Sequence, residues 1–462
     1  MSRYGRFSFW LEHSGDDLSP RDPLHGAINA DVAILGAGFS GLWTAYYLSQ
    51  RDPSLKIVIV EAEIAGFGAS GRNGGWCVAG FPYPLDKLID NYGVDTARAV
   101  YEQMYRSVDE VGRVSGEEGI QSNYVKPGTY EIARGEHRIP DLHETMDLYE
   151  KIGLGENYRL LDAAELSEDI QINRAVGALW KRHGASVQPA ALARGLARAV
   201  ERHGVTIYEQ SPVRDYQGAP NSGLVTDHGE VRANVVVLAG EAYLSRLEKL
   251  KRQIIPITSH MVVTEPITEH IWEQIGWNER GVITGHDSRG GYLNKTIDGR
   301  IAFGAYRSVY PFNSHITDDL DRQEDIFQHA RESCYDWFPV LRLHGIKFTH
   351  AWGGVLGVPR DRMPVMSYDP ASGIATARGY TGQGVATANL AGRTLADLIT
   401  NQRSQLSELP MARHQSPDWE LEPLRWMGAT FVRKSLQRVE KQAEKQGRYP
   451  DKPTLAQRIW GD

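Results

Sequence analysis

The sequence predicts a mixed α/β fold in which a largely parallel sheet is interrupted by an antiparallel one. Parallel-type strands, glycine turns and helices fall in three separated segments, 31–62, 186–245 and 372–400. Between the last two, segments such as HMVVTEP and GYLNKTI alternate apolar and polar residues, which is typical of antiparallel strands with one solvated or pocket-facing side. A chain of 462 residues also exceeds what one hydrophobic core usually supports. We therefore expect one domain to be inserted into another.

The chain is expected to divide into an N-terminal arm, a discontinuous domain with the parallel sheet, an inserted antiparallel domain and a C-terminal extension. The arm, residues 1–29, is polar with proline and glycine and is expected to be extended. The other boundaries follow changes in strand pattern and composition. The parallel-sheet domain takes 30–80, 166–248 and 351–400, the inserted domain takes 81–165 and 249–350, and the helical extension takes 401–462.

Within the extension, the segment EPLRWMGATFVRKSLQRVEKQ (422–442) is amphipathic. Its apolar stripe contains Val432, Leu436 and Val439, and basic residues lie nearby. Most amphipathic helices pack inward on their own protein, so we expect a docked helix. Contact with a membrane surface is the alternative.

Composition restricts the classes of partner. The net charge of −7 and the isoelectric point near 6.1 give no electrostatic reason to expect nucleic acid. Two cysteines exclude a disulfide framework and a multi-cysteine zinc site, which fits a reducing compartment. No run reaches the ~18 apolar residues of a membrane span, and the N-terminus lacks the apolar core of a secretory signal. We expect a cytoplasmic protein with no metal and no stable membrane insertion.

The strongest motif lies in DVAILGAGFSGLWTAYYLSQRDPSLKIVIVEA (31–62), where Gly36, Gly38 and Gly41 separate a strand from a helix. Here the first glycine permits the tight turn, the second lets a pyrophosphate approach the backbone, and the third lets helix and strand pack closely. Glu61 ends the next strand and would accept hydrogen bonds from the ribose hydroxyls. The alternative is that the glycines only form a turn and bind no dinucleotide. The candidate contacts to a dinucleotide are Gly36, Ala37, Gly38, Phe39, Ser40, Gly41, Glu61 and Ala62.

This motif does not distinguish FAD from NAD, because an acid at this place accepts either ribose. The loop that follows, AGFGASGRNGGW (65–76), offers further N–H groups and the cationic Arg72. Such a loop can cover a large, buried prosthetic group, whereas a dissociable nicotinamide cofactor does not usually need one. The sequence therefore favours FAD, with an NAD(P)-dependent dehydrogenase as the alternative.

The segments GAGFSG, VEA, GASGRNGG, VVVLAGEA and GYTGQGVA, in this order and spacing, resemble the D-amino-acid-oxidase-like FAD-dependent oxidoreductases. The chain looks most like their gamma-glutamylputrescine oxidase branch. The resemblance covers about residues 7–440 and includes FSFW near the start and EPLRWMG near the end. It implies a Rossmann-like FAD-binding domain of the glutathione-reductase type with an inserted antiparallel-sheet substrate domain.

The resemblance also implies which residues hold the cofactor. In this family the segment matching 69–75 runs under the pyrophosphate and beside the isoalloxazine ring, and a strand matching SPV places main-chain atoms against the adenine. GYTGQGVA opens a helix whose N-terminus faces the flavin pyrimidine and would stabilise negative charge there, unless its glycines only form a turn. The implied contacts are Gly68, Ala69, Ser70, Gly71, Arg72, Asn73, Gly74, Gly75, Trp76, Val213, Ala239, Gly240, Gly382, Gln383, Gly384 and Val385.

Two departures from the family concern the cofactor and the oxidant. Some relatives attach FAD covalently through a histidine in the second loop or a cysteine near the WGG segment. This chain has Asn73 and Gly353 at these places, so we expect non-covalent FAD, with Cys77 as a small buried hydrophobe. Sarcosine-oxidase-like relatives use a lysine to activate oxygen where Ala302 stands, and Lys295 lies nearby. The electron acceptor is therefore left open between O2 and another carrier.

A third departure concerns the substrate. Amino-acid oxidases clamp the substrate carboxylate with an arginine near the tyrosine of the strand matching GYLNKTIDGR, where this chain has Asn294. An amide does not replace a bidentate guanidinium, so an amine without an α-carboxylate is favoured. The candidate pocket residues are Trp76, His260, Tyr292, Asn294 and Trp352, each with core packing as the alternative.

The expected function is oxidation of an amine C–N bond by hydride transfer to flavin N5, giving an imine and then a carbonyl product. The substrate would be a gamma-glutamylputrescine-like or other primary or secondary amine. Alternatives are an oxidase of a D-amino acid, glycine or sarcosine type, and a non-catalytic flavoprotein binding module. A monomer or small homo-oligomer is expected.

Overall fold

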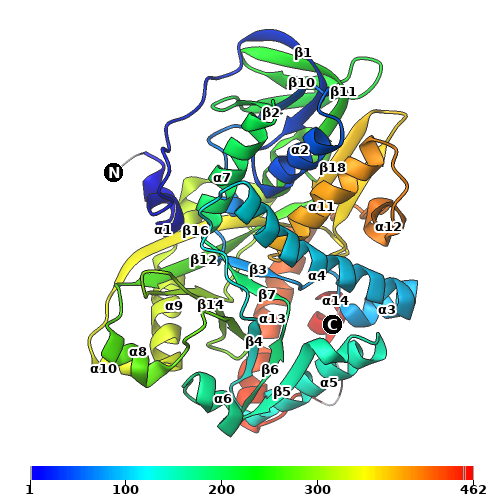
Figure 1. Cartoon of the computed structure of the whole chain (residues 1–462). Coiled ribbons are helices and arrows are strands. Elements are labelled where there is room, and N and C mark those ends of the chain that lie inside the picture. The colour runs from blue at the N-terminus through cyan, green and yellow to red at the C-terminus, as the bar shows by residue number, and fades with distance from the viewer. Residues whose placement is uncertain (1–2, 451, 453, 461–462) are drawn as a thin grey trace.

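The computed structural model describes residues 3–450, 452 and 454–460. Figure 1 shows two sheets, one in the upper and one in the lower half, with helix α4 running between them. Within the described residues the α-helices are α1 (Phe9–Glu12), α2 (Phe39–Arg51), α3 (Leu85–Tyr92), α4 (Val94–Glu117), α5 (Ile139–Lys151), α6 (Ala163–Asp169), α7 (Pro189–Arg202), α8 (Glu269–Ile275), α9 (Glu324–Trp337), α10 (Pro339–Leu343), α11 (Gly384–Ile399), α12 (Gln405–Glu408), α13 (Leu424–Gln446) and α14 (Leu455–Trp460).

The upper sheet has the strand order β17-β18-β11-β1-β2-β8, and the path from β18 to β8 is parallel throughout. A hairpin of β9 and β10 extends β11 on one side, and β17 runs antiparallel at the edge. The strands of this sheet are β1 (Gly26–Leu35), β2 (Ile57–Val60), β8 (Thr206–Tyr208), β9 (Val213–Gln217), β10 (Gly223–Thr226), β11 (Gly229–Leu238), β17 (Val365–Asp369) and β18 (Ile374–Arg378).

Both faces of this sheet are buried, which explains why its strands are continuously apolar. Val32 and Ile34 of β1 pack on the side of α2, α7 and α11, whereas Ala33 faces a second cluster with Leu244 and Leu250. Helices α2 and α11 touch closely, because a Cβ on Gly392 would lie 2.6 Å from Cβ of Trp43. The parallel part of the predicted fold is confirmed.

The lower sheet has the order β16-β12-β15-β14-β13-β4-β6-β5 and is antiparallel except where β13 meets β4. Helices α8, α9 and α10 cover one of its faces around Phe303 and Trp337. Its strands are β4 (Thr129–Ala133), β5 (Tyr158–Asp162), β6 (Gly177–Lys181), β12 (Ile255–Thr264), β13 (Val282–Gly285), β14 (Gly291–Lys295), β15 (Ile301–Ala305) and β16 (Phe348–Val358). A small two-stranded sheet joins β3 (Trp76–Val78) to β7 (Gly184–Ser186).

Three segments differ from the expected layout. Strands β6 and β16 pair inside the lower sheet, so 166–181 and 351–358 do not join the parallel sheet as expected, and we propose boundaries after β6 and after β16. The N-terminal arm is not wholly extended, since a 3₁₀ turn at Gly5–Phe7 precedes α1. The arm turns into a helix because Phe9, Trp10 and Leu11 bury their side chains.

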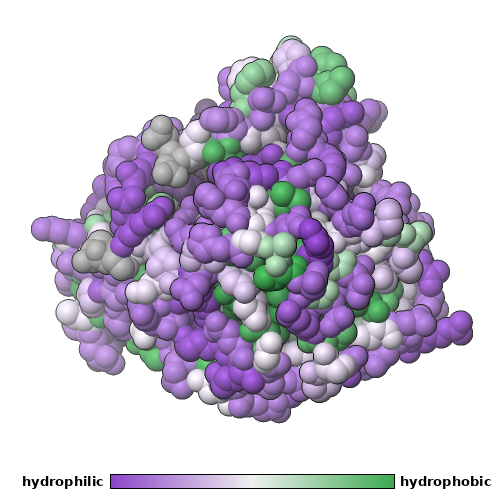
Figure 2. Space-filling view, turned by 90° about the horizontal axis from the view of Figure 1, so that it is seen from above, coloured by the Kyte–Doolittle hydropathy of each residue, from purple (hydrophilic) through white to green (hydrophobic). Residues whose placement is uncertain are grey.

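The amphipathic segment of the extension forms α13, which packs on the protein body with Val432 buried. No helix in the described ranges combines the length and the apolar character that a membrane crossing requires. Seen from above, the molecule presents a mostly hydrophilic face, with an apolar group near its middle and scattered apolar residues toward its edges (Figure 2).

Candidate active site

The candidate site lies at the carboxyl edge of the upper sheet. Strand β1 is flanked by β2 on one side and β11 on the other, so the connections diverge there and leave a crevice beyond the strand ends. Because these strands are parallel, the residues that follow them meet at one edge. These residues are Gly36 after β1, Glu61 after β2, Ala239 after β11 and Gly379 after β18.

The first glycine turn has two glycines packed against backbone atoms and one, Gly38, that faces only a side-chain hydroxyl. Gly36 has φ +100°, and a Cβ there would lie 2.9 Å from the carbonyl oxygen of Ala239. A Cβ on Gly41 would lie 2.0 Å from the oxygen of Gly36. At Gly38 the nearest atom would be the hydroxyl of Ser70, at 3.1 Å, which accepts a hydrogen bond from the N–H of Phe39. Gly38 thus has no backbone atom against it, and of the three glycines it leaves the most room for a phosphate.

The carboxylate of Glu61 fastens this turn to the end of β2. Its Oε2 accepts a hydrogen bond of 2.7 Å from the N–H of Ala37, and its Oε1 accepts one of 3.0 Å from Glu63. Burial raises the pKa of Glu61 to about 7. A carboxylate has about four acceptor positions, so Glu61 retains capacity for ribose hydroxyls. Val213, the expected adenine contact, begins β9 nearby in the same sheet.

The second loop is held by its carbonyl groups. Around the 3₁₀ turn Ala69–Gly71, each oxygen from 71 to 75 accepts a hydrogen bond from a buried or partly buried side chain. The donors are Ser8 to Gly71 (2.7 Å), Trp352 to Arg72 (2.9 Å), Trp10 to Asn73 (2.7 Å), and Asn294 to Gly74 (3.2 Å) and Gly75 (3.1 Å). Among the described residues, nothing accepts from the N–H groups of Asn73 and Gly74. The loop thus keeps amides available for an anionic ligand.

A third turn, from Gly379 to Gln383, precedes α11. Three of its residues have positive φ, namely Gly379 (+88°), Thr381 (+47°) and Gly382 (+92°). Oε1 of Glu241 accepts hydrogen bonds of 3.0 Å from the N–H groups of Gly379 and Tyr380. The Thr381 hydroxyl is buried without a partner in the described structure, and Gly382 is exposed. The turn therefore presents polar atoms at the start of a helix of 16 residues, where the dipole favours negative charge.

A sequence profile described as "DAO: FAD dependent oxidoreductase" matches residues 31–398. The chain belongs to this family. Gamma-glutamylputrescine oxidoreductase of Escherichia coli is 29% identical over 394 residues, which are 85% of this chain and 88% of that protein. Sarcosine oxidase subunit beta of Rhodobacter capsulatus is 24% identical, over 88% of this chain and 94% of that subunit. The crystal structure of glycine oxidase from Geobacillus kaustophilus has the same fold, with a TM-score of 0.71 and 20% identity over 85% of this chain and all of that one.

As a member of the DAO family the chain is an FAD-dependent oxidoreductase, and its residues fit the cofactor. The open Gly38, the spare amides of Asn73 and Gly74, and the unpartnered hydroxyl of Thr381 all occur along one sheet edge. We propose that Gly38, Ser70, Asn73 and Gly74 hold the pyrophosphate region and that Gly382, Gln383, Gly384 and Val385 hold the pyrimidine end. Ala239 and Gly240, which lead from β11 into this edge, remain proposed nucleotide contacts.

One expected cofactor contact is corrected. The guanidinium of Arg72 does not point to a phosphate, because it pairs with Asp321 at 2.5 Å, donates to the carbonyl of Phe67 at 2.9 Å and lies 4.2 Å over the Phe67 ring. Its side chain is nearly inaccessible, at 5% exposure for the residue. Arg72 therefore anchors the second loop to the protein body, and only its main chain is left for FAD.

Four of the five expected pocket residues, all but Trp76, separate into three roles. His260 is wrong as a pocket residue, because it points to the other face of the lower sheet, against Phe327, and shares a hydrogen bond of 2.8 Å with the carbonyl of Leu320. Asn294 and Trp352 are committed to the loop carbonyls. Tyr292 is partly buried beside the loop, within 5.8 Å of Trp76 between ring centroids, and shares a hydrogen bond of 2.5 Å with Ser259. Tyr292 remains a proposed pocket residue.

A cavity of about 1230 Å³ opens beyond Tyr292 between the lower sheet, α5 and α13. An aromatic row leads into it, since the rings of Tyr292 and Tyr306 lie 5.6 Å apart and those of Tyr306 and His286 are stacked at 4.9 Å. Tyr306 and His286 line the cavity. Neither residue was predicted from the sequence, because each directly follows the end of a strand. One pattern does indicate Tyr306: the alternation of GRIAFGAY places it on the same face as Ala302.

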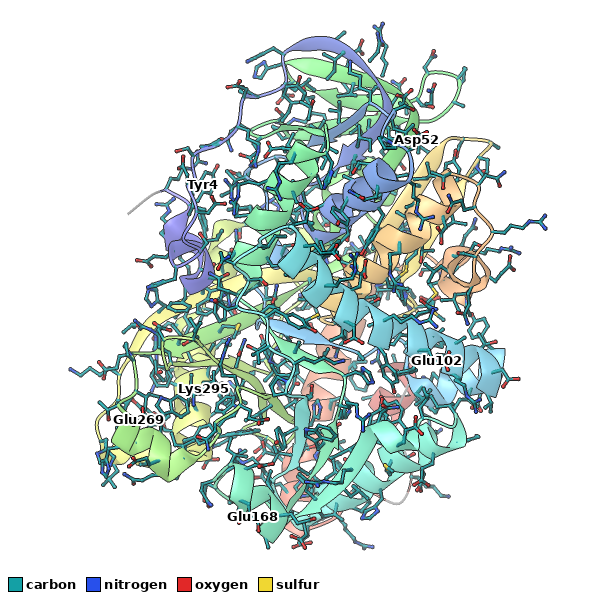
Figure 3. All side chains as sticks on the ribbon, in the orientation of Figure 1. Tyr4, Asp52, Glu102, Glu168, Glu269 and Lys295 are labelled. Carbon is teal, nitrogen blue, oxygen red and sulfur yellow. The ribbon has the colours of Figure 1, made fainter. Side chains whose placement is uncertain are left out.

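Lys295, considered for oxygen activation, lies on the opposite face of β14 from Tyr292. Its Nζ donates to the carbonyl of Trp277 at 2.9 Å and stands 3.8 Å over the ring of Trp272 in α8. Figure 3 shows Lys295 near α8, whose first residue is Glu269. Burial lowers the pKa of this lysine. It is not positioned to act at the cofactor.

Proposed function

We propose that this oxidoreductase oxidises the C–N bond of an amine that carries an anionic group at its far end, as gamma-glutamyl derivatives of diamines do. Bound FAD supplies the chemistry, a two-electron oxidation in which hydride leaves the carbon next to nitrogen, and water then converts the imine to a carbonyl product. The matched relative of Escherichia coli is named for such a substrate. The remaining steps depend on this chain's own side chains.

The cavity carries the proposal. Arg307 and Lys441 line the cavity, and Arg289 lies near its wall. None of these three side chains has an ion pair or a side-chain hydrogen bond in the described part of the chain. All three act on His329 in the cavity wall, where burial first and these positive charges next lower the pKa to about 4. By contrast, the acids Glu440 and Glu420 of the same wall are paired, with Arg138 and Arg360. Two further acids of the wall, Asp86 and Glu144, have no ion pair in the described chain. The positive charge that we propose suits a carboxylate is therefore the one around His329.

We propose that the amine lies beside the second loop, at the inner end of the aromatic row that leads to the cavity. Trp76 and Tyr292 form an edge-to-face pair there, and such a wall packs against an alkyl chain and attracts its cation. Burial raises the pKa of Tyr292 to about 12, so its hydroxyl stays neutral and keeps its bond to Ser259. Excluding water at this place holds the reacting carbon in position.

The same place does not suit an α-carboxylate. The Nδ2 of Asn294 donates to the carbonyls of Gly74 and Gly75, and its Oδ1 accepts from Ser186 at 2.7 Å. Arg280 lies close by, but it donates to Ser186 at 3.1 Å and to the carbonyl of Lys295 at 2.9 Å. With these groups bound to the protein, an amine without an α-carboxylate at the reacting end is favoured.

An anaerobic bleaching screen tests the proposal. FAD-loaded protein is mixed with gamma-glutamyl amines, free diamines, N-methyl amino acids and D-amino acids, and the loss of flavin absorbance is recorded. We expect the fastest bleaching with gamma-glutamyl amines. Fastest bleaching with sarcosine, glycine or a D-amino acid would establish the amino-acid oxidase alternative. Bound flavin that no amine reduces would indicate a non-catalytic flavoprotein, and absence of flavin would remove the whole proposal.

A further inference from the structure

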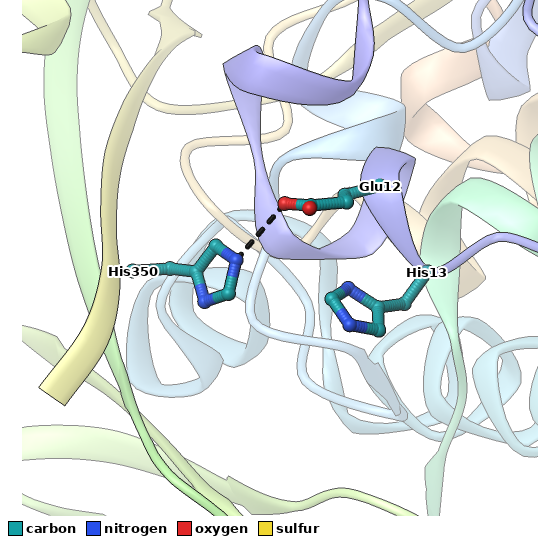
Figure 4. Close-up of side chains that lie close together, drawn as sticks. All are labelled: Glu12, His13 and His350. Atoms are coloured by element: carbon teal, nitrogen blue, oxygen red, sulfur yellow. Dashed lines mark hydrogen bonds and ion pairs between the residues drawn. The ribbon is translucent and has the colours of Figure 1, made fainter. Parts of the chain in front are cut away.

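A cluster of metal-ligating side chains lies on the N-terminal side, away from the cavity. Glu12 and His13, at the end of α1, meet His350 near the start of β16, and the three offer ligand atoms within 4.8 Å of one another (Figure 4). In the described chain this is the only such group of three or more. His350 lies more than 330 positions from Glu12 and His13 in sequence, so no spacing motif indicates the cluster.

Hydrogen bonds fix how the two imidazoles face the cluster. The carbonyl of Phe9 accepts from Nδ1–H of His13 at 3.1 Å. Nδ1 of His350 lies 2.8 Å from the hydroxyl of Thr349, which also lies 3.3 Å from the carbonyl of Thr264 and accepts from Arg300 at 3.2 Å. Nδ1 of each ring thus contacts an oxygen, an arrangement that supports a histidine ligating a metal through Nε2.

The remaining atoms form a ligand set that can take a cation. Nε2 of His350 lies 2.9 Å from Oε2 of Glu12. With its proton on Nε2, His350 donates a hydrogen bond to this carboxylate, and a metal ion bound to both atoms would take the place of that proton. Phe9 packs on both imidazoles, with ring centroids 4.3 Å from His13 and 5.3 Å from His350, and holds them facing the same space.

We propose that Glu12, His13 and His350 bind one Zn²⁺ ion, with water as the fourth ligand. Two imidazoles and one carboxylate are a set that zinc favours, in tetrahedral geometry. Ligands at 2.0–2.2 Å from the metal are roughly 3.4 Å apart in that geometry. Separations of up to 4.8 Å therefore need to close by up to about 1.4 Å, through rotation of the exposed His13 and the half-buried Glu12 and His350 side chains.

The position of this site links it to the cofactor loop. Ser8, at the N-cap of α1, donates to Gly71, and Trp10 within α1 donates to Asn73. On the other side, Trp352 in β16 donates to Arg72. A zinc ion joining α1 to β16 would fasten together the two elements that hold three successive carbonyls of the second loop. Zinc should therefore slow the loss of FAD.

The test uses full-length, FAD-loaded protein freed of metals by a chelator. Addition of Co²⁺ should give the visible absorption of a four-coordinate site at one ion per chain, and Zn²⁺ should displace it. His13→Ala should weaken Zn²⁺ binding more than about 100-fold, since loss of a supporting group alone costs 10–100-fold. His270→Ala is the matched control. His270 is likewise an exposed histidine near a second histidine and a glutamate, with its ring centroid 6.0 Å from that of His344 and its Nδ1 3.8 Å from Oε2 of Glu273, but it is not part of the proposed site.

Equal Zn²⁺ affinity in His13→Ala and the unmodified protein, or no Co²⁺ spectrum at all, overturns the proposal and leaves a protonated histidine–carboxylate pair. His350→Ala repeats the measurement where β16 is altered, and far-UV dichroism with flavin content verifies that each variant is folded. Zn²⁺ should also raise the temperature of flavin release by several degrees in the unmodified protein but not in His13→Ala. An unchanged release temperature with zinc bound overturns the link to the loop.

Discussion

Oε1 of Glu241 accepts a hydrogen bond of 3.0 Å from the N–H of Tyr380, which joins the turn after β11 to the turn before α11. Glu241 itself has φ +48°, and its Oε2 has no partner in the described structure. A carboxylate in this position fixes the main chain that we propose lies at the flavin pyrimidine. Its protonation state therefore concerns both stability and the cofactor.

Burial raises the pKa of Glu241 to about 7 from an ordinary value of 4.5. Between these two pH values the folded state holds a proton that the unfolded state has lost, so the free energy of unfolding falls as pH rises through this window, by roughly 3 kcal/mol. Glu241→Gln should remove this part of the fall. Urea unfolding of flavin-free protein at pH 5 and pH 7.5 measures it, and an unchanged difference between the two pH values would contradict the assignment. The pH dependence that remains in Glu241→Gln is expected from Glu61, whose pKa is also raised to about 7.

The two glycines of the first turn should respond differently to alanine. Gly41→Ala should lower the free energy of unfolding by about 3 kcal/mol or more, because its Cβ would lie 2.0 Å from a backbone oxygen. Gly38→Ala should leave the flavin-free fold within about 1 kcal/mol and weaken FAD binding at least about 10-fold, since a methyl group would occupy the approach of the pyrophosphate. Gly116→Ala, in α4 with no atom within 4 Å of the added Cβ, is the control. Equal losses of folding stability in Gly38→Ala and Gly41→Ala would contradict the assignment of a ligand-facing role to Gly38 and a packing role to Gly41.

The donors to the second loop should govern how firmly FAD is held. Trp352→Phe and Trp10→Phe each leave one loop carbonyl without its donor, at a cost of about 1–3 kcal/mol. We expect FAD to dissociate about 10-fold more readily, with kcat at saturating FAD close to unchanged. Trp180→Phe removes an equivalent bond, to Pro127 at 3.3 Å, away from the loop and should not alter FAD affinity. A large loss of kcat at full FAD occupancy would show that these indoles act in the reaction.

The cationic part of the cavity should determine which amines bind. Arg307→Met should raise KM for a gamma-glutamyl amine about 10-fold and leave KM for the free diamine nearly unchanged, because only the former carries a carboxylate. Arg360→Met is the matched control, since Arg360 lines the same cavity but pairs with Glu420 at 3.1 Å. Equal changes for both amines in Arg307→Met would assign this region a structural role only.

FAD should leave the denatured protein completely. Cys77 is fully buried in the fold, where burial raises its thiol pKa, and a thiol rather than a thiolate is a poor nucleophile. Asn73 is bound to the carbonyls of Ala69 and Ser70, at 3.0 and 3.1 Å, and has no nucleophilic atom. Acid precipitation should therefore place all flavin in the supernatant, and flavin retained on the protein pellet would contradict non-covalent binding.

Contiguous residues determined the dinucleotide turn, which is why the sequence predicted it. The strand, the three glycines, the helix and Glu61 lie within 31 residues of one another, and Gly41 answers a local steric demand, because its Cβ would meet the oxygen of Gly36. The parallel strands were equally visible, because both of their faces are buried and their sequences are continuously apolar. The family resemblance then extended the site to the second loop and the α11 turn.

Pairs far apart in the chain needed the tertiary structure. The loop carbonyls take donors from 63 and 280 positions away, in the case of Trp10 and Trp352, and no local pattern reveals such partners. Strand register determined that His260 and Lys295 face away from the proposed site, because neighbouring residues of a strand face opposite sides of the sheet. The cavity is bounded by residues of α5 and α13 together with residues of the lower sheet, which are far apart in sequence. The sequence by itself thus determined the chemistry of the cofactor turn, whereas the packing of distant segments decided which side chains surround it, since side-chain direction depends on register and burial rather than on residue type.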